Sequence, residues 1–219
     1  MDMKIIGHRG ARGLAPENTL ASLRKGLEHH ADQLEFDLRV TKDGIVVLNH
    51  DSYMRDASGR KLTIKTHSYE ELKQHKPDIT TFEEVLKEFA DKIPLYIEVK
   101  RKVDTRPIIK LLKGQKGDFW LGSKSQKTLR ELHKALPEIP KIVIEPISGV
   151  RARIRANQVD TKLLAMKQLW LWSGFIRAVA RSDFELYAYT LNDSKKAAKW
   201  ARHGLKGIIT DYPDRFEKR

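Results

Sequence analysis

Ionisable side chains with complementary chemistry occur at the ends of short apolar runs in the first half of the chain. They are His8, Arg9, Glu35, Asp37, His50, Glu98 and Lys100. Histidine titrates near neutral pH and can transfer protons, whereas arginine and lysine bind phosphate oxygens through a planar fork and as a point charge, respectively. Three carboxylates in a chain without cysteine favour a hard cation with oxygen ligands, such as Mg²⁺ or Ca²⁺. The set therefore predicts a site that holds a divalent cation, binds a phosphate and moves protons.

An alternating pattern of apolar and polar residues predicts a strand that carries two of the carboxylates on one face. From Gln33 to Val40, hydrophobic residues alternate with polar ones that include Glu35 and Asp37. Because successive side chains of a strand point to opposite faces, both carboxylates point the same way, and in a closed barrel that face would be the interior. Glu98 and Lys100 share one face of a later strand in the same manner.

A short turn follows the first pair of carboxylates. The tripeptide Lys42-Asp43-Gly44 is a turn signal, and the strand-like run from Ile45 to Leu48 comes directly after it. A connection this short implies an antiparallel return and not another barrel strand. Folding about the turn would bring Asn49 opposite Asp37, so we expect His50 to lie beside the carboxylates.

The rest of the chain alternates between strand and helix. Strand patterns occur near residues 5, 35, 97, 120, 143, 164, 187 and 208, and each except the last is followed by a helical pattern. Eight such units predict an α/β fold, a (β/α)8 TIM barrel with a small hairpin insertion after the second strand. A chain of 219 residues suits one sizeable core, so residues 1–219 are predicted to form a single domain. Barrel enzymes build their sites at the carboxyl ends of the strands, so the ionisable residues should converge there.

Several short motifs, in this order, resemble those of the glycerophosphodiester phosphodiesterase family. They are His8-Arg9-Gly10, Pro16-Glu17-Asn18-Thr19, Glu35-Phe36-Asp37, His50-Asp51 and Glu98-Val99-Lys100. The segment from Gly207 to Pro213 is also similar to the family's closing strand, so the resemblance covers almost the whole chain. It implies a hydrolase that converts glycerophosphodiesters to glycerol 3-phosphate and an alcohol with the help of a divalent cation, Mg²⁺ or Ca²⁺.

The resemblance also assigns roles to individual residues. Glu35, Asp37 and Glu98 are the implied metal ligands. His8 and His50 are the implied acid–base pair, and which of the two is the acid stays open.

The positive side chains of the motifs, Arg9 and Lys100, are expected to bind the substrate phosphate. An alternative for the three carboxylates is ion pairing with Lys100 and Arg39 inside the barrel. Three acids that face one cavity need compensation, and a bound cation supplies it well, so the metal site is the favoured interpretation.

Two positions depart from the family pattern. Tyr189 stands where family members often carry tryptophan, and Ser123-Lys124 stands where they often carry Ser-Phe. Both positions are expected to border the substrate pocket, so they bear on the choice of substrate more than on the chemistry.

The segment from Met166 to Ile176 is unusually aromatic and begins where the seventh barrel strand is expected to end. One helix is predicted from Leu169 to Arg181. The residues expected on its core-facing stripe are Leu169, Trp172, Ile176 and Val179, and those outside it are Trp170 and Phe175. Tryptophan beside arginine and lysine is typical of an interfacial membrane contact, although ordinary packing of an outer helix is the simpler interpretation.

Charge separates the two parts of the chain. Residues 1–100 carry 16 basic and 17 acidic side chains, and the rest carry 26 and 12, which leaves the whole chain at +13. Such a field attracts phosphodiesters, anionic lipid surfaces or nucleic acid, and the alternative is a solvated surface of exposed lysine and arginine without a functional role. We find no recognition-helix pattern and no RNA-binding signature, so a nucleic-acid partner is not expected.

Three functions follow from these observations. The leading one is hydrolysis of a small glycerophosphodiester, and a lysophospholipase D acting on lysolipids at a membrane surface is its nearest alternative. A non-catalytic barrel that binds anions or membranes is the third, and the presence of every motif acid and base argues against it. The first 20 residues contain no long apolar run and the chain no stretch of about 18 apolar residues, so we expect a cytoplasmic protein, peripheral to the membrane at most.

Overall fold

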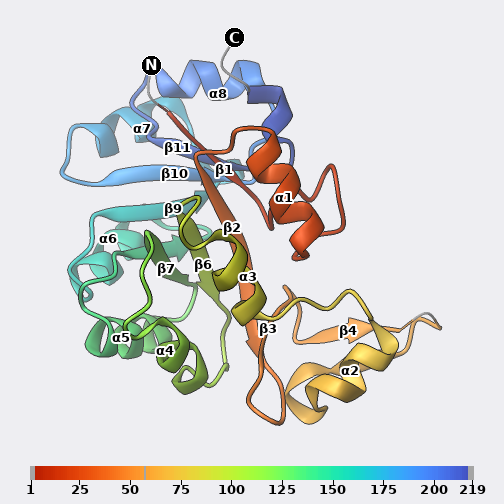
Figure 1. Ribbon diagram of the computed structural model, residues 1–219. Helices are drawn as coiled ribbons and strands as arrows, with labels where there is room; N and C mark the ends of the chain where they lie inside the picture. The colour runs from red at the N-terminus through yellow and green to blue at the C-terminus, as the bar shows by residue number, and fades with distance from the viewer. Residues whose placement is uncertain (1–2, 57, 217–219) are drawn as a thin grey trace.

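Eight parallel strands close into a barrel in the computed structural model, which describes residues 3–56 and 58–216 (Figure 1). The barrel strands are β1 (Lys4–Gly7), β2 (Gln33–Val40), β6 (Leu95–Val99), β7 (Phe119–Ser123), β8 (Lys141–Glu145), β9 (Leu163–Lys167), β10 (Glu185–Tyr189) and β11 (Gly207–Thr210). β1 pairs with both β2 and β11, and this double pairing closes the sheet. The predicted TIM barrel is therefore confirmed.

Seven helices of the described ranges cover the outside of the barrel, and an eighth, α2 (Tyr69–His75), lies in the insertion after β2. The seven are α1 (Leu20–Glu28), α3 (Phe82–Phe89), α4 (Arg106–Leu112), α5 (Gln126–Ala135), α6 (Gly149–Asn157), α7 (Ser173–Ala180) and α8 (Ser194–Ala201). Thr19 accepts a hydrogen bond from the Ser22 N–H, and Ser68 and Thr81 head full capping boxes. Because such caps satisfy backbone N–H groups that a helix leaves unpaired, they fix where these helices start.

The insertion after β2 begins with the predicted antiparallel return. β3 (Val46–Leu48) pairs with β2, and the Asn49 N–H donates to the Asp37 carbonyl over 3.0 Å. A hairpin of β4 (Tyr53–Arg55) and β5 (Lys61–Thr63), the short helix η1 (Ile64–Thr66) and α2 then form a small lobe beside the barrel (Figure 1). This path leads His50 back along β2 to the level of the carboxylates, as the turn signal predicted.

Alternation along the strands divides the apolar residues between two locations. The barrel interior is filled by Ile6, Tyr96, Trp120, Ile142, Ile144, Ala165, Tyr187 and Ile209. Residues of opposite parity, such as Leu34, Phe36 and Leu38 of β2, pack outward against the helices. The interior is therefore a packed core and not an open pore.

The segment after β9 differs from its prediction. The continuous helix expected from Leu169 to Arg181 is broken into η2 (Gln168–Trp170) and α7, with Trp172 in extended conformation between them. The break shifts the helical phase, so Leu169 and Trp172 are 72% and 63% exposed and lie outside the core, whereas Phe175 packs against it. Ile176 and Val179 are buried as predicted.

A buried carboxylate ties the end of β8 to α6. Glu145 Oε1 accepts hydrogen bonds from the N–H groups of Ile147 and Ser148, and the Glu145 carboxylate pairs with Arg151 at 2.5 Å and Arg155 at 3.2 Å. Burial alone would raise the pKa of Glu145, but these partners outweigh it and lower the pKa to about 2.

Glu145→Gln is expected to reduce the free energy of unfolding at neutral pH by up to about 3 kcal/mol. A lowered pKa stabilises the fold above the unfolded-state value of 4.5, and this contribution is lost as the pH falls towards 2. Urea unfolding of the variant and the wild type should therefore differ most near neutrality and converge in acid. Glu138→Gln, at an exposed position, is the control; a constant difference across the pH range would contradict the assignment.

Candidate active site

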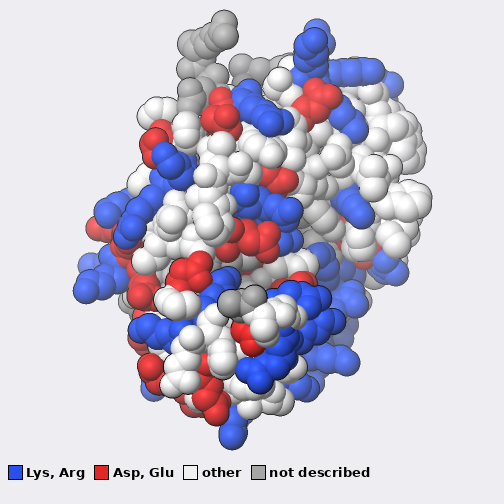
Figure 2. Space-filling view, turned by 90° about the vertical axis from the view of Figure 1, so that its right-hand side faces the viewer, with Lys and Arg blue, Asp and Glu red and all other residues white. Residues whose placement is uncertain are grey.

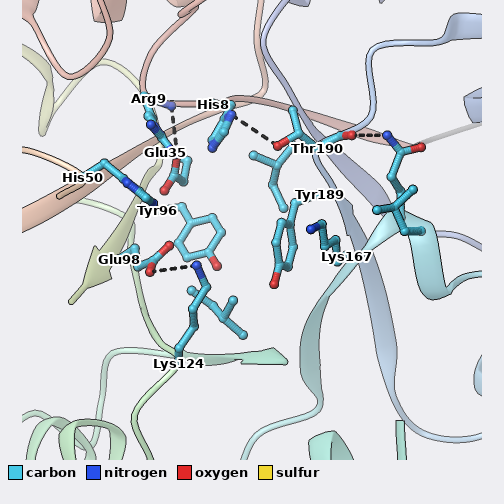
Figure 3. Close-up of a pocket in the computed structure, with 14 residues that line it drawn as sticks. His8, Arg9, Glu35, His50, Tyr96, Glu98, Lys124, Lys167, Tyr189 and Thr190 are labelled. Atoms are coloured by element: carbon cyan, nitrogen blue, oxygen red, sulfur yellow. Dashed lines mark hydrogen bonds and ion pairs between the residues drawn. The ribbon is translucent and has the colours of Figure 1, made fainter. Parts of the chain in front are cut away.

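A cavity of about 320 Å³ lies at the carboxyl end of the barrel, where parallel strands deliver their polar residues. Its lining includes His8, Arg9, Glu35, His50, Tyr96, Glu98, Lys124, Lys167, Leu169 and Tyr189. Figure 3 shows the two histidines on one side and Lys124, Lys167 and Tyr189 on the other. Residues from more than half of the barrel strands thus meet in one pocket.

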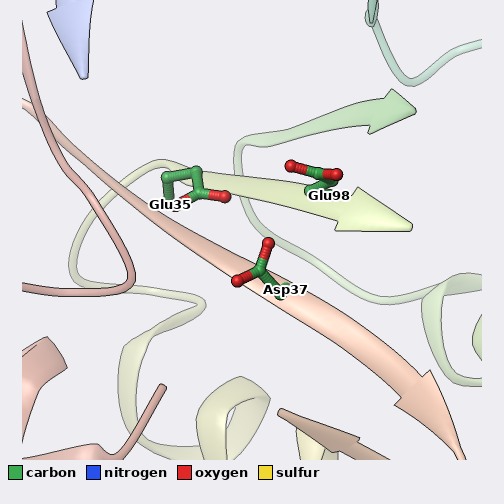
Figure 4. Close-up of side chains that lie close together, drawn as sticks. All are labelled: Glu35, Asp37 and Glu98. Carbon is green, nitrogen blue, oxygen red and sulfur yellow. The ribbon is translucent and has the colours of Figure 1, made fainter. Parts of the chain in front are cut away.

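Three buried carboxylates converge beside this cavity (Figure 4). Asp37 and Glu98 are direct neighbours in the pairing of β2 with β6, and Glu35 lies two residues before Asp37 on the same face. One carboxylate oxygen from each residue lies within 4.8 Å of the others. Lys100 Nζ lies 2.6 Å from Asp37 Oδ1 and 2.7 Å from Glu98 Oε1, so it compensates part of their charge.

The electrostatics of this cluster fit a further cation. Burial raises the pKa of Glu35 well above its usual range, and the charges of Asp37 and Glu98 raise it further. Burial would do the same to Asp37, but Lys100 and Arg9 outweigh it and hold the pKa of Asp37 low. Lys100 pairs with Asp37 and Glu98, and Lys124 Nζ lies 3.7 Å from Glu98 Oε1, yet the pKa of Glu35 stays raised. A hard divalent cation prefers such converging oxygen ligands. The residues therefore fit a Mg²⁺ or Ca²⁺ site.

Asn18 and the backbone of Arg9 hold the carboxylates in place. Asn18 Nδ2 donates to Asp37 Oδ2 over 3.0 Å, and Asn18 Oδ1 accepts from the Asp37 N–H at the same distance. The Arg9 N–H donates to Glu35 Oε2 over 2.9 Å. Gly10 follows with φ +86°, and a Cβ there would lie 2.6 Å from the Leu23 backbone nitrogen, so the loop packs directly on α1.

The guanidinium of Arg9 faces both the carboxylates and the cavity. Its Nε lies 3.2 Å from Asp37 Oδ2, and its Nη1 donates to Glu17 Oε1 over 2.7 Å. These two contacts fix the fork while it lines the pocket.

His8 is oriented by residues that follow the last strands of the barrel. Its Nδ1 lies 2.6 Å from Asp211 Oδ1, and Asn192 Nδ2 donates to Asp211 Oδ2 over 2.9 Å. Burial alone would raise the pKa of Asp211, but the hydrogen bonds from His8 and Asn192 outweigh it and lower the pKa. Asp211 therefore stays ionised beside the imidazole and leaves Nε2 for the pocket.

His50 has a different environment on the opposite side of Glu35. Its Nδ1 lies 2.8 Å from Asp51 Oδ1, and its carbonyl accepts from Arg39 Nη2 over 2.7 Å. Burial lowers the pKa of His50, and the positive charge of Lys100 lowers it further. A neutral imidazole at neutral pH is suited to accept a proton.

Comparison with known proteins agrees with this geometry. The sequence profile of the glycerophosphoryl diester phosphodiesterase family matches residues 8–116. YhdW of Bacillus subtilis, which carries the same family name, is 32% identical, with 97% of this chain and 96% of YhdW covered. The chain belongs to the glycerophosphodiester phosphodiesterase family. It is therefore a phosphoric diester hydrolase.

Two further proteins are similar to the chain over almost its whole length. A phosphodiesterase of Oleispira antarctica, solved with the product sn-glycerol 3-phosphate, superposes with a TM-score of 0.87 at 25% identity and covers 97% of this chain and 94% of its own. A human lysophospholipase D is 23% identical, with 97% of this chain and 84% of the human protein covered. The proteins that the chain resembles thus include one solved with a glycerol phosphate product and one named for a lysophospholipid substrate.

The pocket also contains side chains that sequence reasoning did not single out for phosphate binding. Lys124 and Lys167 line it, whereas Lys100 is 6% exposed and lies between two carboxylates. Tyr189 and Lys124 border the pocket, as predicted for the positions that depart from the family pattern. Among the described residues, the Tyr189 hydroxyl is buried and has no hydrogen-bond partner.

Asp211→Asn is expected to lower kcat about 100-fold with little effect on KM, because the imidazole of His8 loses the carboxylate that orients it. A general folding defect would instead lower the amount of active protein and the melting temperature. Asp104→Asn, at an exposed position on the same face, is the control. A variant with the kcat of the wild type, or one in which KM rises as much as kcat falls, would contradict the positioning role.

Proposed function

We propose that this family member hydrolyses glycerophosphodiesters to glycerol 3-phosphate and an alcohol in the pocket described above. The observation that carries the proposal is that His8 and His50 line one cavity together with Glu35 and Glu98, and that Asp37 lies beside it in the same carboxylate cluster. The Oleispira neighbour, which holds sn-glycerol 3-phosphate as its product, supports the assignment of the phosphate-bearing product.

Each group of residues has a part in the proposed reaction. Glu35, Asp37 and Glu98 would hold Mg²⁺ or Ca²⁺. When bound, the cation lowers the pKa of an attacking hydroxyl and offsets charge on the phosphate. Arg9 binds phosphate oxygens, and Lys124 and Lys167 are additional contacts on the opposite wall. A phosphate-binding role for Lys100 stays a prediction, since its ammonium group already pairs with Asp37 and Glu98.

The histidines divide the proton transfers. We assign His50, whose pKa is lowered, as the base that takes a proton from the attacking hydroxyl. The attacking oxygen forms a bond to phosphorus, and the bond from phosphorus to the alcohol oxygen breaks. His8, paired with Asp211, donates a proton to that leaving oxygen.

The proposal is tested by hydrolysis of glycerophosphocholine, followed as release of choline and glycerol 3-phosphate. We expect turnover that EDTA abolishes and that added Mg²⁺ or Ca²⁺ restores. Turnover that survives EDTA would contradict the metal role, and no turnover by the folded protein with either cation would contradict the substrate.

A second candidate substrate is a lysophospholipid, cleaved in the manner of a lysophospholipase D. It is favoured by Leu169, which lines the pocket although it is 72% exposed, and by the similarity to the human enzyme. Such a substrate resides in a membrane, so the pocket mouth would have to reach a bilayer. Release of choline from lysophosphatidylcholine but not from glycerophosphocholine would put this candidate first.

A further inference from the structure

Exposed apolar side chains gather around the mouth of the pocket. We define the docking patch as Ile147, Val150, Leu169, Trp170 and Trp172, each of which is at least half exposed. All five lie between β8 and the first turn of α6 or between β9 and α7. Because these connections follow the carboxyl ends of barrel strands, the docking patch lies on the face that holds the pocket.

The two parts of the docking patch are continuous. A Cβ at Gly149 would lie 2.5 Å from the ring of Phe175, so the first turns of α6 and α7 are in contact. Phe175 in turn packs on Trp172, with 5.4 Å between ring centroids. Since a contiguous apolar surface of this kind marks an interaction site more often than a scattered one does, it calls for a partner.

The docking patch is held firmly in its exposed position. The Glu145 carboxylate anchors the Ile147 connection, and Leu171 is buried between the two exposed tryptophans. The side chain of Gln168 donates to the Thr190 carbonyl and accepts from Lys196 Nζ over 3.0 Å. These contacts hold Trp170 and Trp172 in exposed positions on the surface.

Positive charge flanks the docking patch on the same face. Lys167 lines the pocket next to Leu169, and Arg101, Lys102 and Lys127 line an adjacent hollow of about 480 Å³ beyond the end of β6. Figure 2 shows that Lys and Arg side chains gather over the lower right of one side of the molecule, whereas uncharged residues cover its upper right. Tryptophan and leucine beside lysine and arginine match the acyl boundary and the headgroups of an anionic bilayer, respectively.

We propose that the docking patch and the flanking cations seat the active-site end of the barrel on an anionic lipid bilayer. None of the helices in the described ranges is long and apolar enough to cross a membrane. The inference stands on surface geometry and does not depend on the proposed reaction, although it would bring the pocket to phosphodiester headgroups.

Tryptophan fluorescence with vesicles tests the proposal directly. Trp170 and Trp172 are exposed whereas Trp120 and Trp200 are buried, so a change on binding reports on the docking patch. Vesicles of phosphatidylcholine with phosphatidylglycerol should cosediment with the protein and shift its emission to the blue. High salt or pure phosphatidylcholine should weaken both effects. Absence of cosedimentation with the anionic vesicles would overturn the proposal.

Matched variants distinguish binding through the docking patch from nonspecific adsorption of exposed apolar side chains. Trp170→Ala combined with Trp172→Ala should weaken vesicle binding at least about tenfold, with hydrolysis of soluble glycerophosphocholine unchanged. Ile45→Ala removes an exposed apolar side chain at the β2–β3 turn and should bind as the wild type does. If both apolar variants lose binding equally, or neither does, the docking patch is not the membrane contact.

The cations have their own control. Arg101→Ser with Lys102→Ser removes two charges from the pocket face, and Lys113→Ser with Lys116→Ser removes two from the connection that leads into β7 at the opposite end of the barrel. The first pair should weaken binding to anionic vesicles several times more than the second. Equal effects would mean that net charge alone attracts the protein to the vesicles, which would overturn the proposed orientation.

Discussion

Replacing His8 or His50 with alanine is expected to lower kcat on a glycerophosphodiester by about 10²- to 10⁴-fold, the usual contribution of a positioned proton donor or acceptor. Both imidazoles line the pocket, and each is held through Nδ1 by a carboxylate, Asp211 for His8 and Asp51 for His50. KM should change little, because the phosphate contacts remain.

The two variants should also differ from each other in a diagnostic way. With His50 as the base, His50→Ala should be partly restored by added imidazole at neutral or higher pH, where imidazole is unprotonated. With His8 as the acid, a substrate whose leaving alcohol needs no proton, such as a nitrophenyl phosphodiester, should recover turnover in His8→Ala only. His75→Ala, at the exposed end of α2, is the control for histidine loss. Full activity in either variant would remove that histidine from the mechanism.

Glu98→Gln is expected to abolish cation-dependent turnover, a loss of at least about 10³-fold, because a cation contributes several kcal/mol to such a transition state. The exchange keeps the shape of the side chain and leaves a carbonyl oxygen beside Lys100, so the barrel should fold normally. It removes one charge from the cluster that Glu35 and Asp37 complete.

A binding measurement keeps this prediction independent of activity. Mg²⁺ or Ca²⁺ should raise the melting temperature of the wild type, because a ligand that binds only the folded state stabilises it, and should have little effect on Glu98→Gln. Glu131→Gln provides a comparison outside the cluster and should keep the full cation response. Equal stabilisation of the wild type and Glu98→Gln would show that the cation binds elsewhere.

Much of the fold could be predicted because it rests on local patterns. The alternation around Glu35 and Asp37 required both carboxylates to share the barrel interior, and the Asp43-Gly44 turn required the return that carries His50. The eight strand patterns and their helices then left few topologies other than a barrel.

Other features depend on contacts that no local pattern contains. Asp211 lies 203 residues from His8 and meets it only because β1 pairs with β11. Lys167 is one of many lysines, and only its position at the end of β9 distinguishes it. The positions predicted for Leu169, Trp172 and Phe175 were wrong because a short 3₁₀ turn, which has no clear sequence signature, interrupts the expected helix.

The candidate catalytic residues and the opposite wall of the pocket come from different parts of the chain. The carboxylates and both histidines come from β1, β2, β3 and β6 or their ends, whereas the opposite pocket wall comes from the ends of β7, β9 and β10. The loops that follow β7, β9 and β10 can therefore differ between relatives and change the choice of substrate, while the carboxylates and histidines stay in place. One contact links the two halves. Asn192 and Asp211 of the second half orient His8 of the first, so an exchange of loops must keep both residues.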